Sequence, residues 1–392
     1  MLAGRERAVA EVDLEAIRHN VRRLMRDLPA GAVHCAVVKA NGYGHGAVPV
    51  ALAALEAGSA WLGVATVTEA EELRAAQLTA PLLIFGPMTG AELERAAAAG
   101  AEVVVWSAPF LAEAGRLGVR VHVKYDTGMG RLGVPRHAAV EFCASAADAG
   151  VLAGLMSHFA TADEADTAFF EIQLARYTSL AAELKGAYPE LLCHTANSAA
   201  TLRGPRAHFD MVRTGIAMYG LAPANDDPFK DDLRPAMKLS SYVAGVREAA
   251  PGDSVGYGRT FVAAELTRVG IVPIGYADGV RRALSNRGEV LVAGRRCQVV
   301  GTISMDQLTV RLPDDWGGEG DEVVFFGAAG DGLAGGSTVA WTGPTAPRFD
   351  APGTPRILCE AVARQLGTIN YEVACDVAPR VVRRYRGVTL AA

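Results

Sequence analysis

The chain has 392 residues, with 38 Lys or Arg against 43 Asp or Glu, and half of its residues are hydrophobic. This length exceeds one ordinary domain and the apolar content excludes a disordered chain, so we expect two folded domains. The formal net charge of −5 and the scattered charges exclude the basic surface that a nucleic acid would need. No stretch reaches the roughly 18 apolar residues of a membrane span, and Arg and Glu interrupt the N-terminus. We therefore expect a soluble, cytoplasmic protein that contacts no membrane.

The six cysteines are too far apart to form a recognisable metal or disulfide motif. They contain no CxxC pair, and no His lies at metal-ligand spacing from them: Cys35, Cys143, Cys193, Cys297, Cys359 and Cys375. Reduced thiols and no metal site are expected.

The first 215 or so residues repeat one theme, a short apolar run that ends in polar residues and is followed by a helical pattern. Asp13 precedes one such helix, and Thr68 with Glu71 resembles a capping box for another. The runs, which we interpret as parallel strands, are Ala32–Val38, Trp61–Ala65, Leu82–Phe85, Val103–Trp106, Val121–Lys124, Leu152–Ser157, Leu191–His194 and Phe209–Arg213.

Eight alternating units in this length favour a closed (β/α)8 TIM-type barrel. An open, doubly wound sheet is the alternative, but it would carry a Gly-rich phosphate turn after its first strand. The segment found there, KANGYGHG, lacks the GxGxxG spacing. We therefore predict a barrel over residues 1–235.

The pattern changes at about residue 236, where strand-like alternation between Gly, Pro and Asp turns begins. We predict a mostly β C-terminal domain over residues 236–392. Within it, Gly327–Pro355 is rich in Gly and Pro and is expected to be a long irregular loop. A helix near Arg356–Leu366 and strands at Asn370–Val373 and Arg380–Tyr385 are expected to close the chain.

Lys39 is the first candidate for chemistry, because it ends an apolar strand and precedes Asn-Gly-Tyr-Gly-His-Gly. A lysine in a partly desolvated barrel mouth can lose its proton near neutrality and form a Schiff base. Taken alone, such a residue is more often an ordinary lysine whose amine reaches solvent.

The other strand ends are also polar, and in a barrel they converge on one face. An arginine, a histidine, a serine and backbone N–H groups before a helix together suit a phosphorylated cofactor, with Ser198, Gly215 and Ile216 as candidate phosphate donors. The polar strand-end residues are Lys124, Asp126, Arg131, His158, His194, Asn197, Ser198, Arg213 and Gly215.

The chain resembles the alanine racemases over roughly residues 8–385. The resemblance rests on nine short strings in the same order: KANGYGHG, DTGMGRLG, SHFATADE, ANSAAT, VRTGIAMYG, GYGRTF, IGYADG, SMDQ and INYEV. Members of that family bind pyridoxal 5′-phosphate (PLP) on a (β/α)8 barrel that precedes a β domain. A single string of this kind is a weak signal, whereas nine in order are specific.

The resemblance assigns roles to individual residues of this sequence. Lys39 matches the lysine that holds PLP covalently, Arg213 the partner of the pyridine nitrogen and His158 the residue that packs along the ring. Tyr257 matches the second catalytic base. The phosphate-binding positions are Tyr43, Ser198, Gly215, Ile216 and Tyr371.

The substrate carboxylate corresponds to Arg131 and the backbone of Met305, which Asp306 follows in the same motif. In many family members the lysine at the position of Lys124 carries a carbamate that orients the arginine.

These residue types suit racemisation, which needs a base on each face of the substrate. Lys39 and Tyr257 would each remove a proton from one enantiomer and return one to the opposite product. A tyrosine of ordinary pKa, near 10, is a poor base at neutral pH, so we expect donors or cations near Tyr257. Arg213 would leave the pyridine nitrogen unprotonated, which favours immediate reprotonation over transamination.

In the family the tyrosine reaches the site from the partner subunit, so the resemblance implies a head-to-tail homodimer with shared sites.

The main prediction is an alanine racemase that supplies D-alanine for cell-wall peptide. The alternatives are a racemase of another amino acid, such as serine or a biosynthetic precursor, a non-catalytic PLP-binding carrier, and a decarboxylase of the same fold, which Arg213 disfavours. The sequence departs from the family pattern at Gly42, at Thr302 and in the length of Gly327–Pro355.

Overall fold

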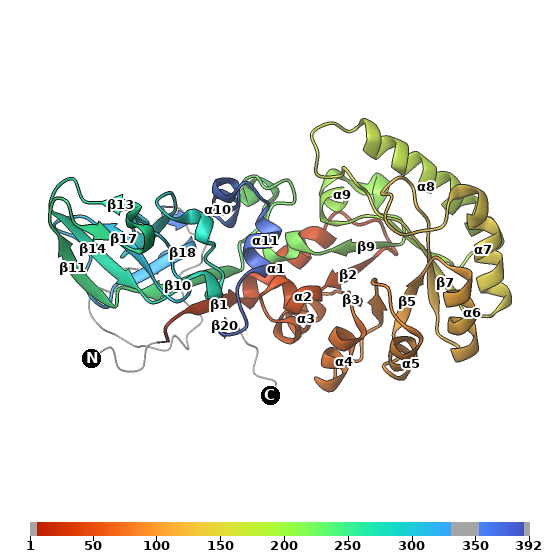
Figure 1. Cartoon of the computed structure of the whole chain (residues 1–392). Helices are drawn as coiled ribbons and strands as arrows, with labels where there is room; N and C mark the ends of the chain where they lie inside the picture. The colour runs from red at the N-terminus through yellow and green to blue at the C-terminus, as the bar shows by residue number, and fades with distance from the viewer. Residues whose placement is uncertain (1–5, 331–352, 388–392) are drawn as a thin grey trace. The chain divides into compact units, whose positions relative to one another are not determined.

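A computed structural model describes residues 6–330 and 353–387. The chain divides into two compact units (Figure 1). The barrel unit comprises Ile17–Met218 and Asp231–Leu233, and the β unit comprises Met1–Ala16, Tyr219–Lys230 and Arg234–Ala392. Across the described ranges, none of the helices combines the length and apolar character that crossing a membrane would require.

Eight parallel strands form the barrel. In sheet order they run β8-β7-β6-β5-β4-β3-β2-β9. Between β8 and β9, the N–H groups of Asp210 and Arg213 donate to the carbonyls of Cys193 and Ala196 at 2.9 and 3.0 Å, which closes the ring. The predicted (β/α)8 barrel is therefore confirmed and the open sheet is wrong. The strands are β2 Val33–Val37, β3 Trp61–Val64, β4 Leu82–Ile84, β5 Glu102–Val105, β6 Val121–Lys124, β7 Leu152–Met156, β8 Leu192–His194 and β9 Met211–Thr214.

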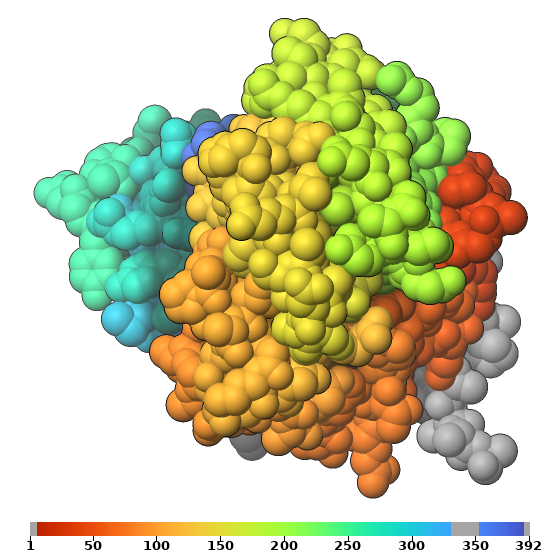
Figure 2. Space-filling model, turned by 90° about the vertical axis from the view of Figure 1, so that its right-hand side faces the viewer, coloured from red at the N-terminus to blue at the C-terminus, as the bar shows by residue number. Residues whose placement is uncertain are grey.

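Helices follow the strands and cover the outside of the barrel. Their segments succeed one another in chain order across the outer face, from orange through yellow to green (Figure 2). The helical elements are α1 Leu14–Met25, α2 Lys39–Tyr43, α3 Ala47–Glu56, α4 Val67–Ala75, α5 Gly90–Ala98, α6 Ala108–Leu117, α7 Arg136–Asp148, α8 Ala168–Ala187, α9 Ser198–Arg203, η1 Pro205–Ala207, η2 Ile216–Tyr219 and η3 Pro228–Asp231.

The start of α4 corrects one prediction. The capping box is formed by Thr66 and Glu69, not by Thr68 and Glu71. Because β3 ends at Val64, the chain turns two residues earlier than predicted. Glu71 instead accepts a hydrogen bond from Nε of Arg95 at 2.7 Å. The predicted start at Asp13 is confirmed, since its Oδ1 accepts from the N–H groups of Glu15 and Ala16.

The β unit is built on a seven-stranded sheet with the order β16-β15-β18-β10-β1-β20, to which β19 adds beside β18. A three-stranded sheet, β11-β14-β17, and the pair β12-β13 complete it. The strands are β1 Val9–Asp13, β10 Met237–Tyr242, β11 Gly245–Ala249, β12 Ser254–Val255, β13 Phe261–Val262, β14 Thr267–Val272, β15 Glu289–Val292, β16 Arg295–Gln298, β17 Leu308–Leu312, β18 Glu322–Ala328, β19 Arg356–Ile357 and β20 Val382–Arg386.

Sequence reasoning missed β1, which pairs with β10 and β20. Its alternating burial, with Ala10 and Val12 buried, is the signal that identifies a half-buried strand. The remaining helical elements of this unit are η4 Tyr257–Arg259, η5 Tyr276–Asp278, η6 Arg282–Leu284, α10 Cys359–Leu366 and α11 Asn370–Cys375.

The C-terminal predictions are mixed. Asn370–Val373 is not a strand but the start of α11, because Asn370, Val373 and Ala374 are buried with helical spacing. The helix predicted for Arg356–Leu366 begins only at Cys359, after β19. The strand predicted for Arg380–Tyr385 is confirmed as β20. Of the predicted loop Gly327–Pro355, residues 331–352 lie outside the described residues.

Candidate functional site

Lys39 lies two residues beyond the end of β2, at the C-terminal end of the barrel strands. The residues that follow form a left-handed turn: φ is +53° at Ala40, +51° at Asn41, +60° at Gly42 and +50° at Tyr43. Outside glycine this conformation costs roughly 1–2 kcal/mol per residue, and such strain concentrates at functional sites. The side-chain Oδ1 of Asn41 accepts from the N–H of Ala47 at 2.9 Å and so ties the turn to the start of α3.

Four of the predicted phosphate-binding residues come together beside this turn. The hydroxyl of Ser198, at the start of α9, accepts from the N–H groups of Gly215 at 3.0 Å and Ala217 at 3.3 Å. A Cβ added to Gly215 would lie 2.3 Å from the phenol oxygen of Tyr43, so the ring occupies the space that a larger residue would fill. Ile216 follows Gly215 at the start of η2. The result is a small cradle of two hydroxyls and consecutive backbone amides, which suits a phosphate.

Arg213 is buried on β9 and belongs to a chain of hydrogen bonds that crosses the barrel interior. Its Nη1 donates to Nδ1 of His194 at 2.6 Å, and Nε2 of His194 contacts Nδ1 of His122 at 2.6 Å. Nε2 of His122 contacts Oε2 of Glu102 at 2.8 Å. Arginine can only donate, so His194 must accept at Nδ1 and donate from Nε2, and His122 must donate to the carboxylate. The chain therefore fixes both imidazole tautomers.

The protonation states agree with this direction of donation. Burial, together with the charge on Arg213, holds the pKa of His194 well below its usual value. Burial also lowers the pKa of Arg213 to about 10, so the guanidinium keeps its proton at neutral pH. The Nη2 of Arg213 donates to the carbonyls of Ser157 and Thr195, at 2.8 and 3.2 Å, which completes its fixation.

Cationic groups dominate the rest of the barrel mouth. Lys124, the last residue of β6, is buried, and its pKa falls to about 8 because of that burial and the charges on Arg131 and Arg213. Burial and then the charges of Arg213, Lys124, Arg131 and Lys39 hold the pKa of His158 well below its usual value. A site that gathers this much positive charge suits ligands with phosphate or carboxylate groups.

The carboxylate of Asp126 shapes the segment that carries Arg131. Its Oδ1 accepts from the N–H groups of Gly128 at 2.9 Å and Gly130 at 3.2 Å. These bonds close a turn after β6 and hold the chain immediately before Arg131. Asp126 also raises the pKa of Lys124, against the lowering by the neighbouring cations.

Tyr257 and Met305 lie together in the β unit, around a hollow of about 300 Å³ that is also lined by Tyr276, Arg282, Ile303, Ser304 and Asp306. Tyr257 is 73% exposed and Met305 51%. Arg282 is the cationic side chain that lines this hollow. Sequence reasoning did not single out Tyr276 or Arg282, although the quoted IGYADG string contains the tyrosine.

A buried aspartate holds the loop that carries Met305. Asp278, at 0% exposure, is bound by both Arg7 and Arg380, and Arg380 also donates to Asp306 at 2.7 Å. The N–H of Ala277 donates to the carbonyl of Met305 at 3.1 Å. The backbone at Met305 is therefore fixed, as a backbone contact to a substrate would require.

Tyr371 is half-buried on α11 of the β unit, next to the buried Asn370. Nδ2 of Asn370 donates to the carbonyl of Ala222 at 2.8 Å and to Oε1 of Glu360 at 3.0 Å. These bonds fix the helical turn from which Tyr371 projects.

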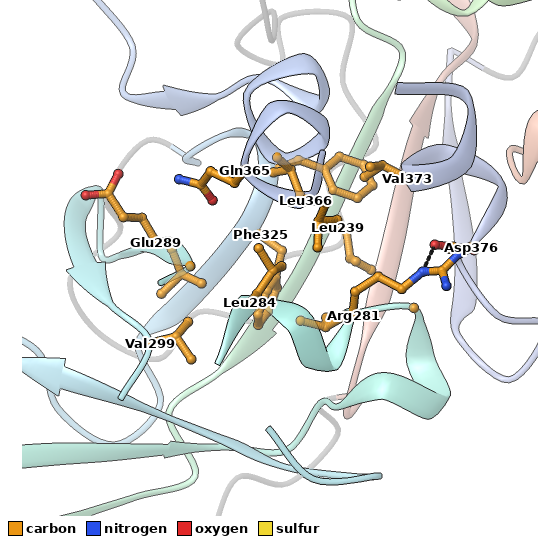
Figure 3. A pocket seen from close by; sticks show the side chains of 16 residues that line it. Leu239, Arg281, Leu284, Glu289, Val299, Phe325, Gln365, Leu366, Val373 and Asp376 are labelled. Carbon is orange, nitrogen blue, oxygen red and sulfur yellow. Dashed lines mark hydrogen bonds and ion pairs between the residues drawn. The ribbon is translucent and has the colours of Figure 1, made fainter. Parts of the chain in front are cut away.

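A second hollow in the β unit lacks such chemistry. It measures about 30 Å³ and is lined mainly by apolar side chains, among them Leu239, Phe325 and Leu366 (Figure 3). At its rim, Arg281 is paired with Asp376 through Nη2 and Oδ1 at 2.7 Å. We interpret this space as a packing gap of the core.

The two units thus define a class of protein: a (β/α)8 barrel with a lysine and a cradle of hydroxyls and backbone amides at its mouth, joined to a β unit that presents a tyrosine. Comparison with known proteins makes the assignment specific. Residues 12–223 match the model of the alanine racemase N-terminal domain, and residues 236–347 match that of the C-terminal domain. The chain belongs to the alanine racemase family, as its sequence motifs predicted.

Similarity extends over the whole chain. It is 40% identical to the alanine racemase of Symbiobacterium thermophilum, over 99% of both chains. The crystal structure of the alanine racemase from D-cycloserine-producing Streptomyces lavendulae superposes with a TM-score of 0.87 at 37% identity, covering 98% of each chain. The Bacillus anthracis enzyme, solved with bound L-Ala-P, gives 0.85 at 36% identity, covering 97% of this chain and 95% of its own.

Proposed function

We propose that this chain interconverts L-alanine and D-alanine with PLP bound at the barrel mouth. The observation that carries the proposal is the cationic mouth, in which Lys39 stands beside the cradle of Tyr43, Ser198 and Gly215. When bound, PLP acidifies the Cα proton of an attached amino acid by delocalising the negative charge left behind.

The described residues fit PLP. Ser198 and the backbone at Gly215 and Ile216 would hold the phosphate, with the phenols of Tyr43 and Tyr371. Arg213, fixed by His194, would donate to the pyridine nitrogen and leave it unprotonated, because an arginine at neutral pH does not surrender its proton. His158 would pack along the ring.

Lys39 and Tyr257 would serve as the two bases. The amine of one and the phenolate of the other each remove the Cα proton from one enantiomer, and the protonated partner returns a proton to the opposite face. Arg131 and the backbone of Met305 would hold the substrate carboxylate. A carbamate on Lys124 would orient Arg131 by placing a negative charge beside its guanidinium.

We further propose that two copies of the chain form a head-to-tail homodimer with shared sites. Two observations support it: Lys39 and Tyr257 belong to different units, and Tyr257 is 73% exposed on the single chain. A second copy would cover the phenol and withdraw it from water. The domains would divide near residue 236, and the enzyme would work in the cytoplasm.

Two experiments test this function. Purified protein supplied with PLP should exchange the Cα hydrogen of L-alanine for deuterium in heavy water and produce D-alanine, whereas a PLP-binding carrier would do neither. The same assay over a panel that includes serine separates alanine from other substrates.

Mixing Lys39→Ala with Tyr257→Ala subunits should restore activity above either parent, and no recovery after demonstrated subunit exchange would rule out shared sites.

A further inference from the structure

The carboxylate of Glu69 connects two neighbouring βα units of the barrel. Its Oε2 accepts from the N–H groups of Ala65 at 2.8 Å and Thr66 at 3.1 Å, within the capping box of α4. Its Oε1 accepts from the N–H of Ala40 at 2.6 Å, on the turn that follows β2. Hydrogen bonds to a charged acceptor are the strong ones, so Glu69 links the cap of α4 firmly to the residue after Lys39.

Ala40 is the first residue of the left-handed turn, so its N–H belongs to the peptide group that directly follows Lys39. The other hydrogen bonds that we describe for this turn come from within residues 38–47: Gly42 donates to Val38, Gly44 to Ala40 and Gly46 to Asn41, at 2.8 to 3.0 Å. A conformation disfavoured for residues other than glycine persists only where its surroundings over-determine it. Glu69 provides such a constraint from the neighbouring strand and helix.

We propose that Glu69 is a positioning residue for Lys39. By holding the peptide group between Lys39 and Ala40, its carboxylate fixes the direction in which the lysine leaves the backbone and keeps the amine in line with the Cα proton. This inference rests on the proposed function, because it takes Lys39 as one of the two bases.

The chain offers a matched control in Glu92 of α5. Thr89 and Glu92 form the same capping box, with the carboxylate accepting from the N–H and hydroxyl of Thr89 at 2.8 and 3.0 Å. In the part of the chain that the structure describes, the hydrogen bonds of the Glu92 carboxylate all go to Thr89. Substitution of Glu92 therefore removes a cap without touching the turn that follows Lys39, and separates positioning from helix capping.

The test compares Glu69→Ala and Glu69→Gln with Glu92→Ala and Glu92→Gln in the PLP-loaded protein. We expect kcat for alanine to fall about 10²-fold in Glu69→Ala, with little change in KM, because a misplaced base slows proton transfer without loosening the substrate. The Glu92 variants should keep the wild-type kcat. Glu69→Gln preserves size and one acceptor oxygen, so it tests the idea even if Glu69→Ala does not fold.

A second readout does not depend on catalysis. In amide hydrogen exchange, residues 38–47 should exchange about tenfold faster in both Glu69 variants, while the Glu92 variants leave this segment unchanged. Equal loss of kcat in the Glu69 and Glu92 variants, or unaltered exchange at 38–47 in Glu69→Gln, would overturn the proposal. If the wild-type protein fails to racemise alanine, the proposed function is wrong, and the exchange comparison still decides whether Glu69 holds the turn.

Discussion

The two units hold their functional groups in opposite ways. In the barrel unit, Lys124 and Arg213 are each 4% exposed, whereas in the β unit Tyr257 is 73% exposed. Burial strengthens the electrostatic interactions through which the barrel mouth would bind PLP, but it demands that each polar group be paired. The phenol of Tyr257 is open to solvent on the single chain, so it needs no such pairing. Under the proposed function, the barrel unit would hold most of PLP, and the β unit would supply Tyr257, the backbone of Met305 and Tyr371.

Lys39→Ala should have the largest effect, because it removes both the attachment point for PLP and one base. We expect racemisation to fall at least about 10³-fold. Borohydride should no longer link PLP to the protein, as mass spectrometry would show. Tyr257→Ala, on the other unit, should lose activity but still be labelled. If both variants lose the borohydride label, PLP attachment does not depend on Lys39 alone, and the assignment of separate roles to Lys39 and Tyr257 is wrong.

Gly215→Ala tests how tightly the phosphate cradle is packed. The new methyl group would meet the phenol of Tyr43 at 2.3 Å and displace it. We expect the PLP dissociation constant to rise about tenfold, equivalent to about 1.4 kcal/mol, measured by fluorescence titration. The control is Gly186→Ala in α8, where the added methyl has nothing within 4 Å and should leave PLP binding unchanged.

His122→Phe breaks the chain behind Arg213. Phenylalanine keeps an aromatic ring at this position but leaves Nε2–H of His194 without its acceptor, and an unsatisfied buried donor costs about 1–3 kcal/mol. We expect the free energy of unfolding of His122→Phe to fall by this amount, and its kcat to fall less than that of Lys39→Ala. Glu102→Gln, which keeps an acceptor for His122, should do less on both counts. If both variants lose the same unfolding free energy and the same kcat, the order of the hydrogen bonds behind Arg213 does not matter.

Lys124 gives the smallest expected effect and a pH dependence. Its pKa is lowered to about 8, so the unprotonated amine that reacts with CO2 becomes abundant as pH rises through 8. The amine adds to CO2 and releases a proton, and the carbamate should be lost as pH falls. Carbon-13 NMR in labelled bicarbonate, from about pH 6.5 to about pH 9, should show a signal that Lys124→Met lacks. The KM for alanine should rise only a few-fold in Lys124→Met. If the NMR signal is absent at every pH, Lys124 does not carry a carbamate.

The barrel could be predicted because its strands are short, continuous apolar runs that end in polar residues. Burial on both faces of a parallel strand makes such runs visible without any partner being known. The same reasoning failed for β1, whose partners β10 and β20 lie more than 200 residues away in sequence. It also failed for Asn370–Val373, where a short run with strand propensity is overridden by helical burial.

The site residues that stand in sequence motifs could be predicted. The contacts that depend on how distant strands meet could not. Lys39, Ser198, Arg213 and Gly215 stand in recognisable strings, and the structure brings them to one barrel face. The connection of His194 to Glu102 joins side chains on three different strands, β8, β6 and β5, so no local pattern reveals it. The hydrogen bond from Ala40 to Glu69 likewise depends on where β3 ends. The sequence offers two overlapping capping boxes there, at 66–69 and at 68–71, and does not show which of them forms.

The proposed mechanism makes Lys39 and Tyr257 separate bases on opposite faces of the substrate. The most direct measurement is deuterium exchange at Cα by Tyr257→Phe, with each alanine enantiomer supplied separately in heavy water. We predict that one enantiomer exchanges its Cα hydrogen through Lys39 without being converted, while the other neither exchanges nor converts. If both enantiomers are still racemised at similar rates, one base serves both faces and the two-base mechanism is wrong.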